Sequence, residues 1–140
     1  MRNNQLDGKE HAHDIKDIIK NHPSLSILDF SNTELNVNKN KLRNVGAVAI
    51  VAGILETEGC SLISEINLAY NYLTADSLPF FGKLNNPDFI QLRSLNLSYN
   101  DLGPDSIAIL APILPCIEYL NLSNTKMNNQ TVQDFVHTFK

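Results

Sequence analysis

A chain of 140 residues, 43% of them hydrophobic and 19% charged, is long enough to form one domain around its own hydrophobic core. Its formal net charge of −4 argues against a duplex-binding protein, which needs clustered Lys and Arg to neutralise phosphates, so we expect no nucleic-acid partner. No stretch approaches the roughly 18 apolar residues of a membrane span, and residues 1–10 lack the apolar run of a signal peptide.

Cysteine and histidine spacing gives no sign of a metal site or a disulfide framework. Cys60 and Cys116 are far apart and form no CxxC motif. His11 and His13 are two residues apart in an expected helix, which places them on different faces. No nucleophile motif, catalytic triad or phosphate-binding glycine loop is present. We therefore expect free thiols, no metal, no cofactor and no catalytic activity.

The N-terminal part of the chain predicts a flexible segment followed by a helix. Residues 1–9 are polar, and Ile15, Ile18 and Ile19 then recur at helical spacing within residues 10–24. We interpret residues 10–24 as a helical half-repeat that caps a repeat array, since the first unit of such an array otherwise exposes its apolar flank.

An eleven-residue pattern, L-x-x-L-x-L-x-x-N-x-L, then occurs four times, starting near residues 25, 63, 92 and 117. Positions 4 and 6 alternate as in a short strand with one face in the core, and positions 3, 5 and 7 point to the other face. The first copy ends at Leu35. At position 9, Asn71 and Asn100 suit a turn, whereas Thr33 and Thr125 bond turned backbone only weakly. We expect weaker ties at both ends of the array.

Apolar residues at helical spacing predict a helix after each strand. Residues 45–55 are continuously apolar, which favours a well-buried helix. Pro79 fits the first turn of the next helix, and Pro112 and Pro115 should end the third. The last helix either closes the array or leaves the edge strand from Tyr119 to Leu122 available for pairing. The stripes of the later helices are Leu78, Phe81 and Leu84; Ile107, Leu110 and Leu114; and Val132, Phe135, Val136 and Phe139.

These copies resemble the leucine-rich-repeat family, and their long units are similar to the ribonuclease-inhibitor type, in which each strand is followed by a helix. The resemblance covers residues 10–140. It implies an α/β solenoid, a right-handed β-α superhelix with a short parallel sheet on the concave face and helices on the convex face. It also implies a protein-binding module, with inhibition or positioning of a partner as the further expectation.

All four tyrosines fall at template positions that face the concave side or its rim. Tyr is enriched at binding hot spots, which favours an interface, although tyrosine also prefers strands for packing reasons alone. Small polar groups surround them, as is typical of a surface that recognises protein rather than a small molecule. The candidate binding residues are Tyr70, Tyr72, Tyr99 and Tyr119, with Asp29, Asn67, Asn96 and Asn121 at position 5 beside Ser31, Ala69, Ser98 and Ser123 at position 7.

Residues 36–43 account for most of the extra length between the first two copies and are expected to project from one rim as a loop. Lys39, Lys41 and Arg43 make this the only locally basic stretch, which suits an acidic partner; the alternative is a solvated loop. Four short strands give a concave sheet on the order of 350 Å². A standard interface takes about 800 Å² per partner, so we expect binding through both this face and the loop.

The alternative function is a structural or adaptor unit that self-associates through its C-terminal edge, although we expect a monomer. Asn is abundant, with 18 residues, and together with frequent Ile this suggests an AT-rich genome. Such a composition is similar to that of the leucine-rich-repeat effectors that intracellular bacteria such as Legionella deliver into host cells. The resemblance implies a host protein or another bacterial effector as partner. It also implies a cytoplasmic location, or a host cell as the destination after secretion.

Overall fold

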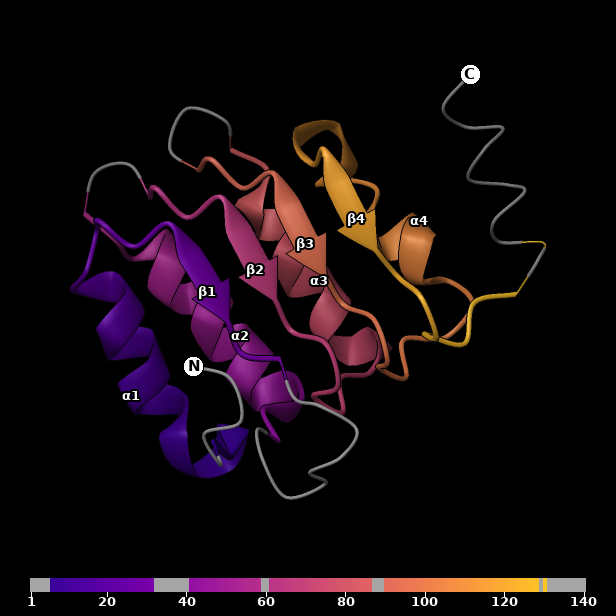
Figure 1. The fold of residues 1–140 in the computed structure, drawn as a ribbon, viewed down its shortest axis with the longest axis horizontal. Coiled ribbons are helices and arrows are strands. Elements are labelled where there is room, and N and C mark those ends of the chain that lie inside the picture. Colours follow the sequence, from indigo (N-terminus) through magenta and orange to yellow (C-terminus); the bar gives the residue numbers. More distant parts are fainter. Residues whose placement is uncertain (1–5, 32–40, 59–60, 87–89, 129, 131–140) are drawn as a thin grey trace.

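The computed structural model describes residues 6–31, 41–58, 61–86, 90–128 and 130. Within these residues a four-stranded parallel sheet has the order β1-β2-β3-β4, so each strand pairs with the next along the chain (Figure 1). The residues predicted at template position 4 pair in one row across all four strands. The parallel sheet is therefore confirmed. The strands are β1 (Ile27–Asp29), β2 (Glu65–Asn67), β3 (Ser94–Asn96) and β4 (Tyr119–Asn121).

Helical segments connect the strands and lie behind the sheet in Figure 1, and one more helix precedes the first strand and lies at that edge of the sheet. Pro79 lies in the first turn of the helix after β2, and Pro112 follows the end of the helix after β3, as predicted. The last helix, expected over residues 132–139, falls outside the described residues. The segments are α1 (Gly8–Lys20), α2 (Arg43–Leu55), η1 (Ala75–Ser77), α3 (Leu78–Phe81), η2 (Gly82–Leu84), α4 (Ser106–Leu110) and η3 (Leu114–Cys116), where η marks a 3₁₀ helix.

The hydrophobic core lies between the sheet and these helices. Leu28, Ile66 and Leu95 at position 4 are buried, and Leu120 in β4 is half-buried. The helix stripe Leu78, Phe81 and Leu84 is fully buried, as predicted. The ends of α2 differ from the prediction, because Val45 and Leu55 are 46% and 45% exposed. Only the middle of that apolar run packs into the core.

Helix α1 corrects the predicted limits of the N-terminal segment. It begins at Gly8, inside the segment expected to be flexible, because the Asp7 carboxylate accepts a hydrogen bond from the Lys9 N–H at 2.8 Å and caps the helix. It ends at Lys20 rather than at residue 24. Ile15 and Ile19 are buried, but Ile18 is 38% exposed, so the predicted three-residue stripe is wrong at Ile18.

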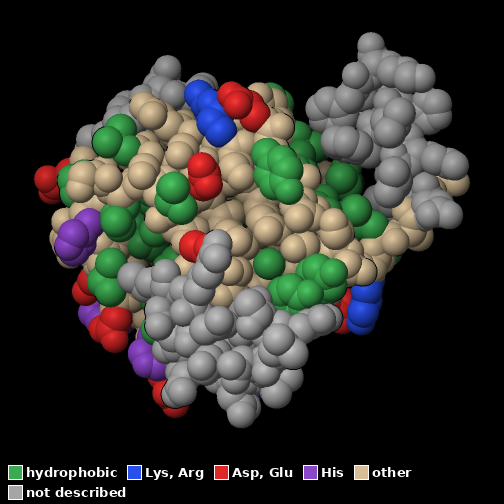
Figure 2. Space-filling view, viewed as in Figure 1, with side chains coloured by type: hydrophobic (Ala, Val, Ile, Leu, Met, Phe, Trp, Pro, Cys, Tyr) green, Lys and Arg blue, Asp and Glu red, His purple; other side chains and the backbone are tan. Residues whose placement is uncertain are grey.

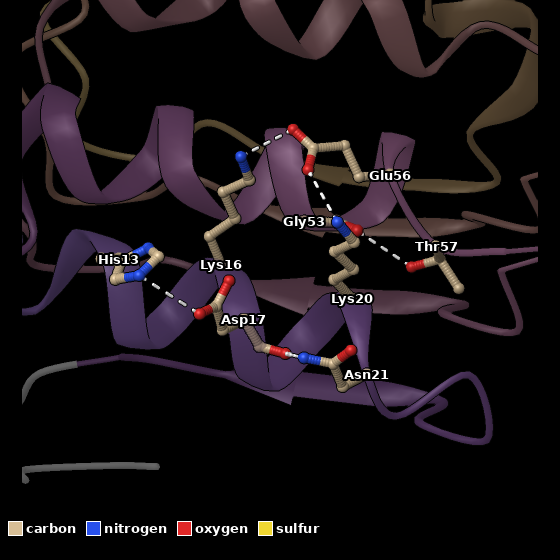
Figure 3. Close-up of polar contacts among 8 residues, drawn as sticks. All are labelled: His13, Lys16, Asp17, Lys20, Asn21, Gly53, Glu56 and Thr57. Carbon is tan, nitrogen blue, oxygen red and sulfur yellow. Dashed lines mark hydrogen bonds and ion pairs between the residues drawn. The ribbon is translucent and has the colours of Figure 1, made fainter.

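Helices α1 and α2 pack closely through glycines and are joined by ion pairs at one end (Figure 3). A Cβ at Gly53 would lie only 2.9 Å from the Ile19 Cβ, so the close approach requires glycine. The Glu56 carboxylate, just after α2, pairs with Lys16 Nζ at 2.7 Å and Lys20 Nζ at 3.5 Å in α1. This contact fixes α1 beside α2 at the β1 end of the molecule (Figure 1).

The end of the first repeat also differs from the prediction. The Leu42 N–H donates to Asn71 Oδ1 at 3.4 Å, as the Leu73 N–H donates to Asn100 Oδ1 at 3.0 Å. Leu42 is fully buried and so takes the eleventh position that the template gave to Leu35, which lies outside the described residues. In the sequence, the Asn-x-Leu triplet that ends at Leu42 indicates that Leu42 occupies this position.

Two buried asparagines tie the middle repeats together. Asn100 Oδ1 accepts from the N–H groups of Asn71 and Leu73, and its Nδ2 donates to the Leu68 carbonyl at 3.0 Å. Asn71 Nδ2 likewise donates to a backbone carbonyl of the preceding repeat. Thr125 instead donates its hydroxyl to the Leu122 carbonyl in its own repeat, at 2.6 Å. The tie of the last repeat to the one before it is instead a backbone bond, from the Gly103 N–H to the Thr125 carbonyl at 3.0 Å, and Thr33 lies outside the described residues.

Candidate functional site

The structure brings two of the four tyrosines together. Tyr70 and Tyr99 occupy the same position in neighbouring repeats, and their rings stack with centroids 4.1 Å apart and planes at 11°. Tyr70 is half-buried, whereas Tyr99 remains 43% exposed. Tyr72 and Tyr119 are more exposed and lie elsewhere, Tyr119 at the start of β4. The stacked pair is therefore the centre of the candidate site.

The backbone beneath the stacked rings is in the left-handed region. Tyr70 has φ of 58° and Tyr99 of 56°, and Asn124 has 56° at the same position of the last repeat. An L-residue with a large side chain is disfavoured there, and Asn is tolerated better. Residues in such unfavourable conformations cluster at functional sites. The strained backbone leaves no mark on hydrophobic periodicity, so sequence reasoning placed these tyrosines but missed their stack.

The polar column at position 5 is tied to its own backbone. Asn96 Oδ1 accepts from the Ser98 N–H at 3.1 Å and from the Ser98 hydroxyl at 2.8 Å. This bond orients the planar amide and leaves the Nδ2 donors as the group that it offers to a partner. The hydrogen bonds of the column therefore stabilise its own backbone and also hold the Nδ2 donors in place. The same arrangement joins Asp29 to Ser31, Asn67 to the Ala69 N–H, and Asn121 to Ser123.

The face that carries this column is the one left open by the helices (Figure 1). Figure 2 shows that most of the described part of this face is coloured as neither hydrophobic nor charged. At position 3 the strands present Ile27, Glu65, Ser94 and Tyr119, so this row is more varied than the column beside it. The surface offers hydrogen bonds and a few apolar contacts, with little charge.

Lys41 and Arg43 lie in a second part of the site. Their segment was expected to project as a loop, and this is wrong for its last three residues. The Lys41 N–H donates to the Leu6 carbonyl at 2.7 Å, Leu42 is buried between the two cations, and Arg43 begins α2. Lys39 lies outside the described residues. A hollow of about 570 Å³ is lined here by Lys41, Arg43, Asn44, Val45, Tyr72 and Thr74, a set that we call the basic hollow.

A third surface lies at the β4 end of the sheet. A hollow of about 590 Å³ is bounded there by mainly apolar residues, including the exposed Tyr119 and the half-buried Leu120. Among the described residues, β4 pairs with β3 alone, so its other edge is the one considered for self-association. The lining residues are Ile107, Tyr119, Leu120, Asn121, Leu122, Ser123 and Met127.

Titratable groups in the described ranges do not assemble into a metal centre. No group of three His, Cys, Asp or Glu side chains is close enough there to hold a metal ion. A hydrogen bond from the Lys9 N–H lowers the pKa of Asp7, and one from Lys16 lowers the pKa of Glu56. Both carboxylates lie at helix ends. The half-exposed Cys116 thiol donates to Asn85 Oδ1 at 3.2 Å.

Comparison with known families identifies the repeats. A family model described as Leucine Rich repeat matches residues 33–51 and 91–110. Both matched stretches are similar to leucine-rich repeats. The second stretch spans β3, Asn100 and α4, and the first includes Leu42, which agrees with the position of Leu42 in the structure. A search of curated proteins finds no match. In the part of the chain that is described, no helix is long and apolar enough to cross a bilayer.

Proposed function

We propose that this leucine-rich-repeat protein binds another protein through the open face of its sheet, with the Tyr70–Tyr99 stack at the centre of the contact. Leucine-rich repeats generally mediate protein–protein interaction. The single observation that carries the proposal is the pair of rings held against each other on left-handed backbone while Tyr99 stays 43% exposed. Rigid aromatic groups of this kind provide contact area at low entropic cost.

The geometry of the site supports an extended contact. A sheet of on the order of 350 Å² is smaller than the about 800 Å² that a standard interface takes from each partner. Tyr70 belongs to the stack and Tyr72, two residues later, lines the basic hollow, so the two regions adjoin. The bound protein therefore covers the open face and the rim around the basic hollow together.

Several groups on this surface are fixed before a partner arrives. The position-5 amides are held by serine hydroxyls and backbone N–H groups, as at Asn96 and Asn121. The Tyr70 and Tyr99 rings hold each other. Groups that are already ordered lose less conformational entropy on binding, which favours affinity. The open face therefore behaves as a preorganised recognition surface.

The test is partner capture by the double variant Tyr70→Asn with Tyr99→Asn. Asn124 shows that Asn adopts this backbone conformation in the same protein, so the fold should be retained. We expect the retained partner to fall by about tenfold or more, as hot-spot aromatics require, with little change in melting temperature. Leu55→Asn, which alters an exposed apolar residue on α2, is the matched control and should retain the partner. Undiminished capture by the double variant contradicts the proposal.

The identity and fate of the partner are a further part of the proposal. The Asn-rich composition and the repeat type support a bacterial effector whose partner is a host protein or another effector. The ribonuclease-inhibitor resemblance supports inhibition or positioning of that partner. Mass spectrometry of the captured protein identifies it, and an assay of its activity with and without the repeat protein separates inhibition from simple recruitment.

A second candidate function is self-association through β4. The apolar hollow at this end, with Tyr119 57% exposed, is the observation that favours it. An unpaired strand edge is a template for pairing with a second chain. Light scattering across a wide concentration range separates the two functions, because a strict monomer at the highest concentration excludes self-association.

A further inference from the structure

The basic hollow has a feature that the open face lacks, which is two cations without an ion-pair partner in the described ranges. Several cations elsewhere are paired: Arg93 lies 3.4 Å from Glu118, and Lys126 lies 2.6 Å from Asp101. Neither Lys41 nor Arg43 forms an ion pair with a residue of the described ranges. In a chain of net charge −4, two unpaired cations lining one hollow form a local reversal of charge.

The backbone that carries these two cations is held in place. The Lys41 N–H donates to the Leu6 carbonyl at 2.7 Å, and the Lys41 carbonyl accepts from the Gly8 N–H at 3.1 Å. The Arg43 N–H donates to the Asn71 carbonyl at 2.9 Å. Bonds therefore fix the origin of each side chain relative to α1 and to the second repeat. A binding site gains precision when its side chains start from such a rigid frame.

One wall of the basic hollow is equally fixed. Asn44 forms two hydrogen bonds with Thr74, from its Nδ2 to the Thr74 hydroxyl at 2.7 Å and from the Thr74 N–H to its Oδ1 at 2.9 Å. These bonds join the start of α2 to the segment after β2. The exposed Val45 and Tyr72 add apolar surface to the same hollow. The hollow therefore combines two cations with apolar walls on a rigid scaffold.

The carboxylates near the hollow are already engaged. Asp7 caps α1 through the Lys9 N–H at 2.8 Å, and Asp76 accepts from the Thr74 hydroxyl at 3.3 Å. Neither forms an ion pair with Lys41 or Arg43 in the described ranges. The Asp7 carboxylate attracts Arg43 at longer range, and within the described ranges both cations keep their ion-pairing capacity for a charge on another molecule.

We propose that the basic hollow binds an acidic side chain, Asp or Glu, of the partner protein; this rests on the proposed function. The Arg43 guanidinium supplies paired N–H donors that match a carboxylate, and Lys41 supplies a second positive charge. Tyr72 and Val45 pack against the methylene groups of the incoming side chain. A volume of about 570 Å³ is ample for one such side chain. The net charge of −4 disfavours a long polyanion such as nucleic acid.

The probe is a fluorescein-labelled hexaglutamate peptide, with binding followed by fluorescence anisotropy at about 50 mM salt, where screening is modest. The chain should bind it, and a labelled hexalysine peptide should not bind. Lys41→Gln with Arg43→Gln keeps much of the side-chain length and removes both charges, so the dissociation constant should rise by about tenfold or more. Failure of the peptide to bind, or unchanged binding by this variant, overturns the proposal.

The matched control is Lys20→Gln with Lys83→Gln, which changes the net charge equally on the helical side of the molecule. It should weaken hexaglutamate binding by less than about twofold, because general attraction between surface charges is screened. Equal weakening by both double variants overturns the proposal in favour of diffuse electrostatics. Inorganic phosphate that displaces the peptide at a concentration where acetate does not overturns it in favour of a phosphate site.

The outcome is separable from that of the proposed function. The Tyr70→Asn with Tyr99→Asn variant leaves the basic hollow intact and should still bind hexaglutamate, even though it loses the captured protein. Tyrosine-dependent capture together with no hexaglutamate binding refutes the acidic side chain alone. Hexaglutamate binding together with tyrosine-independent capture refutes the role of the open face and keeps the basic hollow.

Discussion

Ser77 and Ser106 occupy equivalent buried positions, each four residues after the last leucine of its repeat, and both are fully buried. Their hydroxyls differ in one respect. Ser77 Oγ donates to the Thr74 carbonyl at 2.9 Å, whereas Ser106 Oγ has no hydrogen-bond partner among the described residues. A buried hydroxyl without a partner has lost its hydrogen bonds to water and has formed none in the protein, so its burial is unfavourable for folding. The two serines therefore make opposite contributions to folding.

We predict that Ser77→Ala lowers the free energy of unfolding by about 1 kcal/mol, since it removes a made hydrogen bond. Ser106→Ala should leave the free energy of unfolding unchanged or raise it, because it removes an unsatisfied group. Urea denaturation of the two variants beside the original protein measures both effects. A loss at Ser106 as large as that at Ser77 would show that the Ser106 hydroxyl finds a partner.

The template positions predicted which tyrosines lie on the surface, but they did not predict which tyrosine rings contact each other. Position 8 placed Tyr70 and Tyr99 in neighbouring repeats, and adjacency in a parallel sheet follows from the repeat. The left-handed backbone that brings the rings into contact depends on turn geometry, which residue spacing does not encode. The bond from Ser98 to Asn96 likewise depends on the bend at the strand end.

At the scale of elements, two opposing effects meet where α1 contacts α2: helix propensity favours Ala over Gly, and close packing favours Gly. Ala is ordinarily about 1 kcal/mol better than Gly inside a helix. A Cβ at Gly53 would lie 2.9 Å from both the Ile19 Cβ and the Lys16 carbonyl oxygen, so the helices would have to separate. Overpacking of this kind typically costs about 1–3 kcal/mol.

We predict that Gly53→Ala lowers the melting temperature and that Gly82→Ala does not. A Cβ at Gly82 would meet only Pro112 side-chain atoms at 3.6 Å, an ordinary contact, so the smaller entropy of the unfolded chain should stabilise by about 0.5 kcal/mol. Thermal unfolding of the two variants provides the comparison. A Gly53→Ala protein as stable as Gly82→Ala would mean that α1 and α2 are not in close contact in solution.

The ion-pair cluster between these helices makes stability depend on pH. Hydrogen bonds from Lys16 and then Lys20 lower the pKa of Glu56 below its ordinary value of 4.5. A carboxylate with a lowered folded-state pKa stabilises the fold fully above the ordinary value, and this contribution is lost as the pH falls through the folded-state value. The side chains are partly exposed, so salt weakens the effect.

We predict that Glu56→Gln lowers the melting temperature at about pH 7, and that the difference from the original protein shrinks toward zero below the ordinary pKa. Melting curves at several pH values, each at low and high salt, provide the measurement. A difference that persists undiminished into strong acid would assign the effect to packing of Glu56 instead of its charge.

The elements that local spacing predicted are the strands and the buried parts of the helices. Periodicity located β1 to β4 and the α3 stripe, because burial on one face leaves a repeating pattern. It misplaced the end of the first repeat, because a Thr-x-Leu triplet ends at Leu35 and an Asn-x-Leu triplet ends at Leu42, and the hydrogen bond from Leu42 to Asn71 decides between them. The exposure of Ile18 depends on what packs beside α1, which the sequence of α1 does not contain.

Among the described residues, helices cover one face of the sheet and no helix covers the other, and the groups suited to binding gather on this second face and its rim. The Tyr70–Tyr99 stack, the ordered Asn column and the basic hollow adjoin through Tyr70 and Tyr72. We therefore expect a partner protein to dock on this open face and not on the helices.

The most direct test is the dissociation constant of the captured partner for two arginine variants. Ser94→Arg places a long cation at the centre of the open face, in β3, and Ala108→Arg places the same group on an exposed position of α4. The account predicts that Ser94→Arg weakens binding by about tenfold or more and that Ala108→Arg changes it by less than about twofold. Loss of binding in Ala108→Arg with full binding in Ser94→Arg would contradict it.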